Sequence, residues 1–142
     1  MTADERWELL VALDDELLRG GVILSEWCAL IVREADTAFA NGAHLASILT
    51  AVSAIETYLR SEHAATGKER LVELIDKSSI DAGLKDDLHV LRKYRNRWVH
   101  VDEPRNDSKL LEQPGVAERE LEDMALFAER ALRRTIYENP WV

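Results

Sequence analysis

The sequence predicts an all-α protein, an antiparallel bundle of four to six helices that forms one domain over residues 1–142. Apolar residues recur at helical spacing along nearly the whole chain. The chain has only six Gly and three Pro, too few turn residues for a β-sandwich or a barrel. Hydrophobic residues make up 46% of the chain, which is enough to form a buried core.

The first three helices are expected between residue 2 and about residue 63. Thr2 and Glu5 form a capping box that starts the first helix, which Gly20-Gly21 ends, and Ser25 caps the second helix. The expected apolar stripe of the first helix comprises Trp7, Leu10, Val11, Leu13, Leu17 and Leu18, and that of the second comprises Trp27, Cys28, Leu30, Ile31 and Phe39. Helical periodicity predicts that both stripes face the core.

The second half of the chain is expected to form a short helix over residues 70–77, a fifth helix from about 81 to 99, and a last helix from about 116 to 137. Pro104 and Pro114-Gly115 indicate a loop over residues 101–114. The face of the last helix expected to be buried consists of Leu121, Met124, Ala125, Ala128, Leu132 and Ile136.

Composition excludes several classes of protein. The single cysteine, Cys28, excludes an internal disulfide framework and a thiolate zinc cluster, and we expect it to be a small buried apolar residue. The four histidines lack metal-ligand spacing, so neither a metal nor a cofactor is expected. No apolar run reaches the roughly 20 residues that span a bilayer, and the acidic start lacks the basic region of a signal peptide. We therefore expect a cytoplasmic protein with no membrane partner.

Charge is unevenly distributed in this acidic chain of net charge −9. Such a chain repels nucleic acid overall. Four cations nevertheless lie within six residues, at Arg92, Lys93, Arg95 and Arg97. This local patch can bind a phosphate, although it would not give strong non-specific binding.

The fifth helix separates into two faces when it is projected at about 100° per residue. The side expected to be buried carries Leu84, Leu88, Leu91, Tyr94 and Trp98, and the opposite side carries Lys93, Asn96 and His100. Asn96 and His100 are four residues apart, so the amide can hydrogen-bond and orient the imidazole.

Arg95 falls on the buried flank of this helix, where a guanidinium requires a partner. Glu56 on the third helix is the best candidate, with Arg60 competing for the same carboxylate. Helical spacing alone also allows a simpler interpretation, in which Arg95 makes a structural salt bridge and His100 merely ends the helix.

The segment Arg95-Asn96-Arg97-Trp98-Val99-His100 resembles the signature of the higher-eukaryote and prokaryote nucleotide-binding (HEPN) family. In that signature four to six residues separate an Arg from a His, and the residue directly after the Arg is usually Asn, Asp or His. Here the gap is four residues and Asn96 follows the Arg. The surrounding order of helices is similar over roughly residues 25–137, with Glu56 on a preceding helix and a closing helix after the motif. Some HEPN toxins carry a modified Tyr two residues after the His, where this chain has Asp102. The resemblance therefore does not extend to that mode of regulation.

The resemblance implies a metal-independent endoribonuclease of toxin–antitoxin or phage-defence type. Arg95, Asn96 and His100 would be catalytic and Glu56 would support them. Arg92, Lys93 and Arg97 would bind RNA phosphates. A homodimer would bring two copies of the motif together, and an antitoxin or regulatory protein would be a further partner.

Two alternatives remain open. The family also contains non-catalytic members, so the chain is alternatively a HEPN-like dimeric module that binds a nucleotide, an RNA or a protein without cutting. In the third interpretation it is an inert helical adaptor in which Arg95 pairs with Glu56 inside the core.

Overall fold

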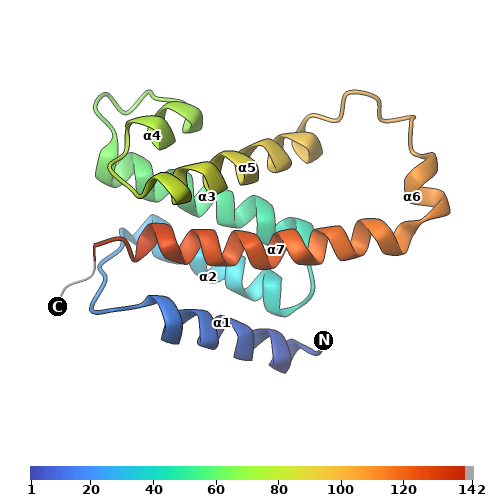
Figure 1. Ribbon diagram of the computed structural model, residues 1–142, viewed down its shortest axis with the longest axis horizontal. Helices are drawn as coiled ribbons and strands as arrows, with labels where there is room; N and C mark the ends of the chain where they lie inside the picture. Colours follow the sequence, from blue (N-terminus) through green and yellow to red (C-terminus); the bar gives the residue numbers. More distant parts are fainter. Residues whose placement is uncertain (140–142) are drawn as a thin grey trace.

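The computed structural model describes residues 1–139, which form seven α-helices and no strand (Figure 1). The helices are α1 (Ala3–Leu17), α2 (Glu26–Ala40), α3 (His44–His63), α4 (Leu71–Lys77), α5 (Ala82–Val99), α6 (Ser108–Glu112) and α7 (Pro114–Ile136). The all-α prediction is confirmed. The number of helices exceeds the predicted range because α6, of five residues, forms inside the expected loop.

Helix ends follow the local signals in the sequence. The Thr2 hydroxyl accepts the Glu5 backbone N–H at 3.2 Å, and the Glu5 carboxylate accepts the Thr2 N–H at 2.8 Å, which completes the capping box. Ser25 caps α2 through the Cys28 N–H at 3.1 Å. Gly42, with φ of 76°, turns the chain after α2, a conformation that favours glycine.

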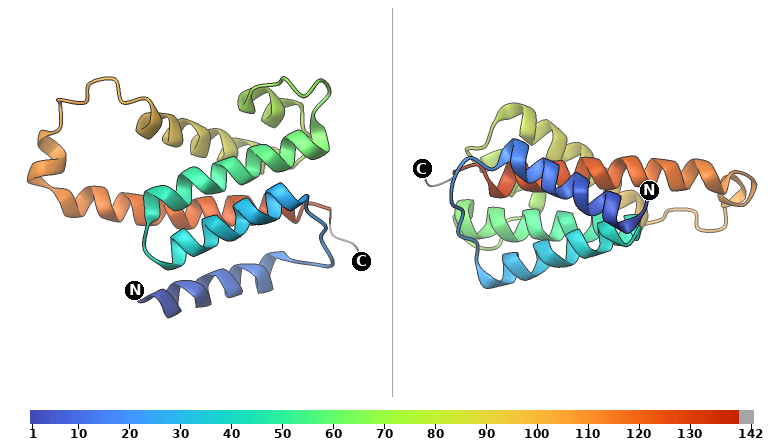
Figure 2. Two further views of the ribbon diagram at one scale, coloured as in Figure 1. Left: turned by 180° about the vertical axis from the view of Figure 1, so that it is seen from behind. Right: turned by 90° about the horizontal axis from the view of Figure 1, so that it is seen from below.

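The core lies around α3, which packs against α2, α4, α5 and α7, while α1 covers α2 and α7 from outside (Figure 2). Its largest fully buried side chains include Phe39, Leu10, Ile48, Ile55, Leu59, Leu88 and Leu132. Cys28 is buried as predicted, with its thiol 3.7 Å from the Ala54 carbonyl oxygen. Burial raises the pKa of this thiol to about 11, so the sulfur is not a ready nucleophile.

The predicted stripes of the first two helices are partly wrong. Of the stripe predicted for the first helix, Trp7, Val11 and Leu18 are exposed, and of the stripe predicted for the second, Trp27 and Leu30 are exposed. For the first helix the reason is the outer position of α1, which buries only Leu10 and Leu13. A helix with one covered side cannot bury a stripe that wraps around it.

A buried ionic cluster joins α1, α2, α3 and α7. Arg133 on α7 is only 2% exposed and donates to Asp14 at 2.9 Å, to Asp36 at 2.9 and 3.1 Å, and to Glu129 at 2.7 Å. Ser47 on α3 donates to the other Glu129 oxygen at 3.1 Å. Because a buried guanidinium is stable only when its donors are matched, this cluster fixes the three other helices to α7.

Glu129 is fully buried in this cluster, and its ionisation is displaced accordingly. Burial, and then the neighbouring Asp36, raises the pKa of Glu129 to about 9. Arg133 behaves oppositely. Burial alone would lower its pKa, but the bonds to Asp36 and the nearby carboxylates raise it. The cluster therefore holds a protonated Glu129 beside a permanently charged Arg133 at neutral pH.

Beyond α5 the chain leaves the bundle. Every residue from 99 to 116 is exposed, and α6 contains no buried residue. Figure 1 shows this segment, which we call the arm (residues 100–116), extending past the ends of the other helices before α7 returns. His100 is the first residue of the arm.

Candidate active site

The candidate site lies where α5 ends and the arm begins. The His100 backbone N–H donates to the Asn96 carbonyl at 3.0 Å, and His100 has φ −131° and ψ 71°, so the helix stops there. The predicted buried face is largely confirmed. Leu84, Leu88, Leu91 and Tyr94 are buried, and Trp98 packs partly buried against the core.

Arg95 is half-buried and turns its guanidinium toward its neighbour in sequence. Its Nε and Nη2 atoms donate to the Asn96 side-chain oxygen at 3.2 and 2.8 Å. Among residues 1–139 no carboxylate forms an ion pair with Arg95. Since a guanidinium has five N–H donors, Arg95 retains donors for an anion.

The expected pair between Arg95 and Glu56 does not form. Glu56 lies 3.9 Å from Arg60 instead, one turn further along α3. Two side chains at i and i+4 on one helix meet with little loss of entropy, which favours this local pair over one between helices. Glu56 therefore does not hold Arg95 in this structure.

Asn96 also acts differently from its predicted role. Its side-chain oxygen accepts from Arg95, and its link to His100 runs only through the backbone. A charged donor makes a stronger hydrogen bond to an amide oxygen than a neutral imidazole does, and His100 has already left helical geometry. Asn96 positions the guanidinium, while the His100 side chain is exposed and hydrogen-bonds to no described residue.

The three flanking cations lie on different sides of α5. Arg92 donates to His89 Nδ1 at 3.4 Å, and Nε2 of His89 lies 2.7 Å from Asp76. Lys93 is exposed. Arg97 sits over the Tyr94 ring, 5.2 Å from its centroid, and lies 3.6 Å from Glu120 on α7. Arg92 therefore lies with His89 on α5, whereas Arg97 faces the arm.

A cavity beside the site was missed by sequence reasoning. It has a volume of about 320 Å³, opens to solvent, and is lined by the end of α5, by α6 and by the start of α7. Trp98 lines it, together with Leu110 from the segment expected to be a loop and Val116 from the start of the expected last helix. The adjacent apolar residues Leu110 and Leu111 were the available signal that this segment forms structure.

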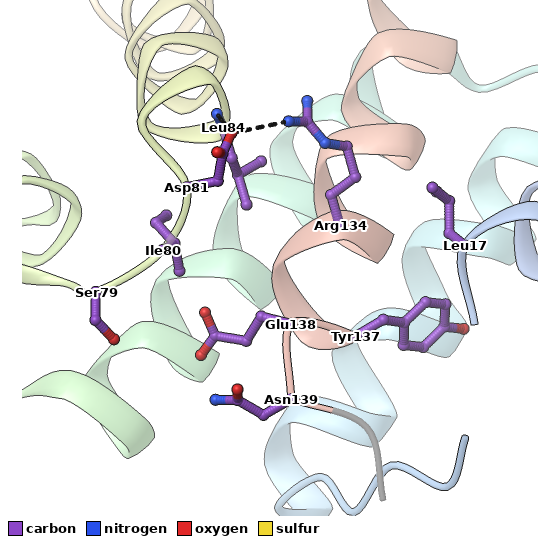
Figure 3. Close-up of a pocket in the computed structure, with 9 residues that line it drawn as sticks. All are labelled: Leu17, Ser79, Ile80, Asp81, Leu84, Arg134, Tyr137, Glu138 and Asn139. Atoms are coloured by element: carbon purple, nitrogen blue, oxygen red, sulfur yellow. Dashed lines mark hydrogen bonds and ion pairs between the residues drawn. The ribbon is translucent and has the colours of Figure 1, made fainter. Parts of the chain in front are cut away.

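A second cavity, of about 350 Å³, lies at the other end of the bundle (Figure 3). Arg134 there donates to Asp87 at 2.7 Å and lies 3.8 Å from Asp81. Glu138 accepts the Tyr58 hydroxyl at 3.0 Å and lies 2.7 Å from His63 Nε2. These charged groups already have partners that tie helices together, so this cavity is structural.

Within residues 1–139 no three His, Cys, Asp or Glu side chains lie close enough together to hold a metal ion. In the same range, no helix is both long enough and apolar enough to cross a membrane. Comparison with protein-family models, with curated proteins and with solved structures finds no significant match.

Proposed function

We propose that the chain is a metal-independent endoribonuclease of HEPN type, in which Arg95 binds the scissile phosphate and His100 transfers protons. One observation carries the proposal. The half-buried Arg95 guanidinium is held by a neutral amide rather than by a carboxylate, five residues before an exposed histidine. Arg133 in the core shows the opposite arrangement, because its guanidinium is held by three acidic side chains.

The reaction follows from the chemistry of RNA. The ribose 2′-oxygen attacks the adjacent phosphorus, a new P–O2′ bond forms, and the P–O5′ bond breaks. The products are a 2′,3′-cyclic phosphate and a 5′-hydroxyl. One group must accept the 2′-OH proton and another must donate a proton to the leaving 5′-oxygen, while a cation stabilises the extra charge on the phosphorane.

The residues present suit these roles. An imidazole exchanges protons near neutral pH, and a guanidinium matches two phosphate oxygens with its fork of donors. Asn96 fixes the plane of the Arg95 guanidinium at 2.8 and 3.2 Å. Arg92, Lys93 and Arg97 would hold flanking phosphates of the strand.

A homodimer would complete the site. The reaction needs an acid and a base, whereas the end of α5 offers one histidine. The next histidine on α5, His89, is bound to Asp76. Two copies related by a two-fold axis would supply two His100 side chains. The exposure of Val99 and His100 leaves this end of the helix accessible to a second copy.

In the cell such a nuclease would act as a toxin or a phage-defence effector, restrained by an antitoxin or regulatory protein. Induced expression of the wild-type chain would then slow growth, and expression of His100→Ala would not.

The test is cleavage of RNA by the purified protein in excess EDTA, beside His100→Ala. We expect wild-type protein to produce 2′,3′-cyclic phosphate ends, and His100→Ala to lose about 10²–10⁴-fold in rate, the usual contribution of a general acid or base. His63→Gln is the matched control, because glutamine keeps a donor for Glu138 far from the site. Equal cleavage by wild type and His100→Ala would refute the proposal.

One observation favours a non-catalytic function. No described side chain hydrogen-bonds to His100, so one copy of the chain does not orient the imidazole for proton transfer. The second candidate is therefore a dimeric HEPN-like module that binds RNA without cutting it. Binding of RNA that depends on Arg95, with no cleavage products at any pH between 5 and 9, would select it.

A further inference from the structure

The cavity beside the site has the chemical character of a binding pocket. Its volume of about 320 Å³ falls in the usual range for ligand pockets. The apolar side chains of Trp98, Leu110 and Val116 line it. Polar groups of Gln113 and Glu120 lie on the same lining, so the pocket combines apolar surfaces with an amide and a carboxylate that accept or donate hydrogen bonds.

Two cations also line this pocket. Arg97 has a side chain that is 68% exposed, and Lys109 on α6 is exposed as well. In a chain of net charge −9, two solvent-facing cations beside an apolar pocket create a local preference for an anionic ligand. Glu120, 3.6 Å from Arg97, orients one of these cations without burying it.

We propose that this pocket binds the base of a ribonucleotide, with the attached phosphate on Arg97 and Lys109. A nucleobase has two apolar faces and a polar edge, which match the apolar side chains and the Gln113 amide of the lining. An aliphatic side chain of a protein partner would leave the Gln113 amide and the Lys109 ammonium group of the lining without counterparts.

The position of the pocket connects it to the candidate site. Arg97 and Trp98 directly follow Arg95 and Asn96 on the last turn of α5, and Val101, which lines the pocket, directly follows His100. The pocket therefore lies at the same end of α5 as Arg95 and His100, and a base bound there would set the base preference of cleavage. This last step rests on the proposed nuclease function, whereas binding of the base does not.

Trp98, which lines the pocket, carries a polar group that a ligand could satisfy. Its indole N–H is buried and has no hydrogen-bond partner among the described residues, and the same holds for the neighbouring Tyr94 hydroxyl. An unpaired buried donor disfavours its own position. The Tyr94 hydroxyl lies close to the Trp98 N–H and to Glu120, and neither the hydroxyl nor the N–H is satisfied by a hydrogen bond of normal geometry, so an acceptor on a base would supply a partner that this wall of the pocket lacks.

The test measures binding of the four ribonucleoside 3′-monophosphates to ¹⁵N-labelled protein, read from the Trp98 indole N–H signal. Trp98→Phe assigns that signal. We expect at least one nucleotide to shift it. Leu110→Glu should weaken that nucleotide by about tenfold or more, the order that stacking of one base contributes. Leu111→Glu is the matched control, since Leu111 is 76% exposed, lies outside the pocket lining and receives the same charge.

A second variant guards against an effect of charge or of local unfolding. Ala117→Phe fills the pocket from α7 without a charge and should weaken binding as Leu110→Glu does. The proposed base-binding pocket would be refuted if none of the four nucleotides shifted the Trp98 indole N–H signal. Equal nucleotide affinities of Leu110→Glu and Leu111→Glu would also refute it. A protein that binds nucleotides here but cuts no RNA would refute the nuclease alone. A nuclease that binds none of them here would refute the pocket alone.

Discussion

Arg133 and Arg95 are both withdrawn from solvent, yet their surroundings differ completely. Arg133 meets Asp14, Asp36 and Glu129 at 2.7 to 3.1 Å and is 2% exposed. Arg95 meets one amide oxygen and no carboxylate among residues 1–139. The charge and donors of Arg133 are consumed by the fold, whereas those of Arg95 remain available. This difference separates a structural arginine from a candidate for binding an anion.

Removing the guanidinium from the buried cluster should have the largest effect on stability. Arg133→Ala leaves Asp14 and Asp36 without a cation and Glu129 without its donor, and we expect a loss of about 3–5 kcal/mol in the free energy of unfolding. Urea denaturation followed by circular dichroism measures it. Arg130→Ala is the control on the same helix. Its exposed pair with Glu16, at 2.9 Å, should contribute at most about 1 kcal/mol. Similar losses in both variants would show that the cluster does not hold the helices.

The protonated Glu129 makes the stability of the buried cluster depend on pH. Its pKa rises from 4.5 in the unfolded chain to about 9 in the folded protein. The stabilisation is therefore fully present below about pH 4.5 and is lost as the pH rises through about 9.

Glu129→Gln keeps the neutral shape and should remove this dependence. Between pH 6 and 8, wild-type stability should fall relative to the variant by up to about 1.4 kcal/mol per pH unit, the limit for one proton. Unfolding curves at several pH values check this. A constant difference between the two proteins would contradict the assignment of a neutral Glu129.

A carboxylate placed beside Arg95 would give this arginine the kind of partner that Arg133 has. Asn96→Asp places an acid at the atom that Arg95 already contacts at 2.8 Å. We expect at most about 1 kcal/mol of added stability, because the pair is partly solvated, together with weaker RNA binding in a filter or fluorescence assay. Asn139→Asp makes the same charge change at the other end of the bundle and should leave RNA binding unchanged. Equal effects of the two substitutions would mean that net charge, not Arg95, controls binding.

Features set by neighbouring residues were predictable from the sequence. The capping box at Thr2, the cap at Ser25 and the buried face of α5 all depend on residues within a few turns of one another. The exposure of Trp7 and Trp27 was not predictable, because it depends on which other helices pack against α1 and α2.

The partners of the two arginines show the same limit. Arg133 meets Asp14 and Asp36 at sequence separations of 119 and 97 residues, which no local pattern encodes. For Arg95, the motif located the residue and its neighbours Asn96 and His100. The motif did not indicate that Glu56 pairs with Arg60 rather than with Arg95, because helical spacing allows both pairs. The pocket lined by Leu110 was missed because prolines on both sides made the segment read as a loop.

The most direct measurement of the central claim is made on Arg95→Ala, for which unfolding free energy and RNA cleavage in EDTA are determined on the same preparation. An arginine that the fold does not use should give a stability change within about 1 kcal/mol, while cleavage falls by about two to three orders of magnitude, as when one group that stabilises a developing anion is removed. A stability loss comparable to that of Arg133→Ala, or cleavage at the wild-type rate, would contradict the account.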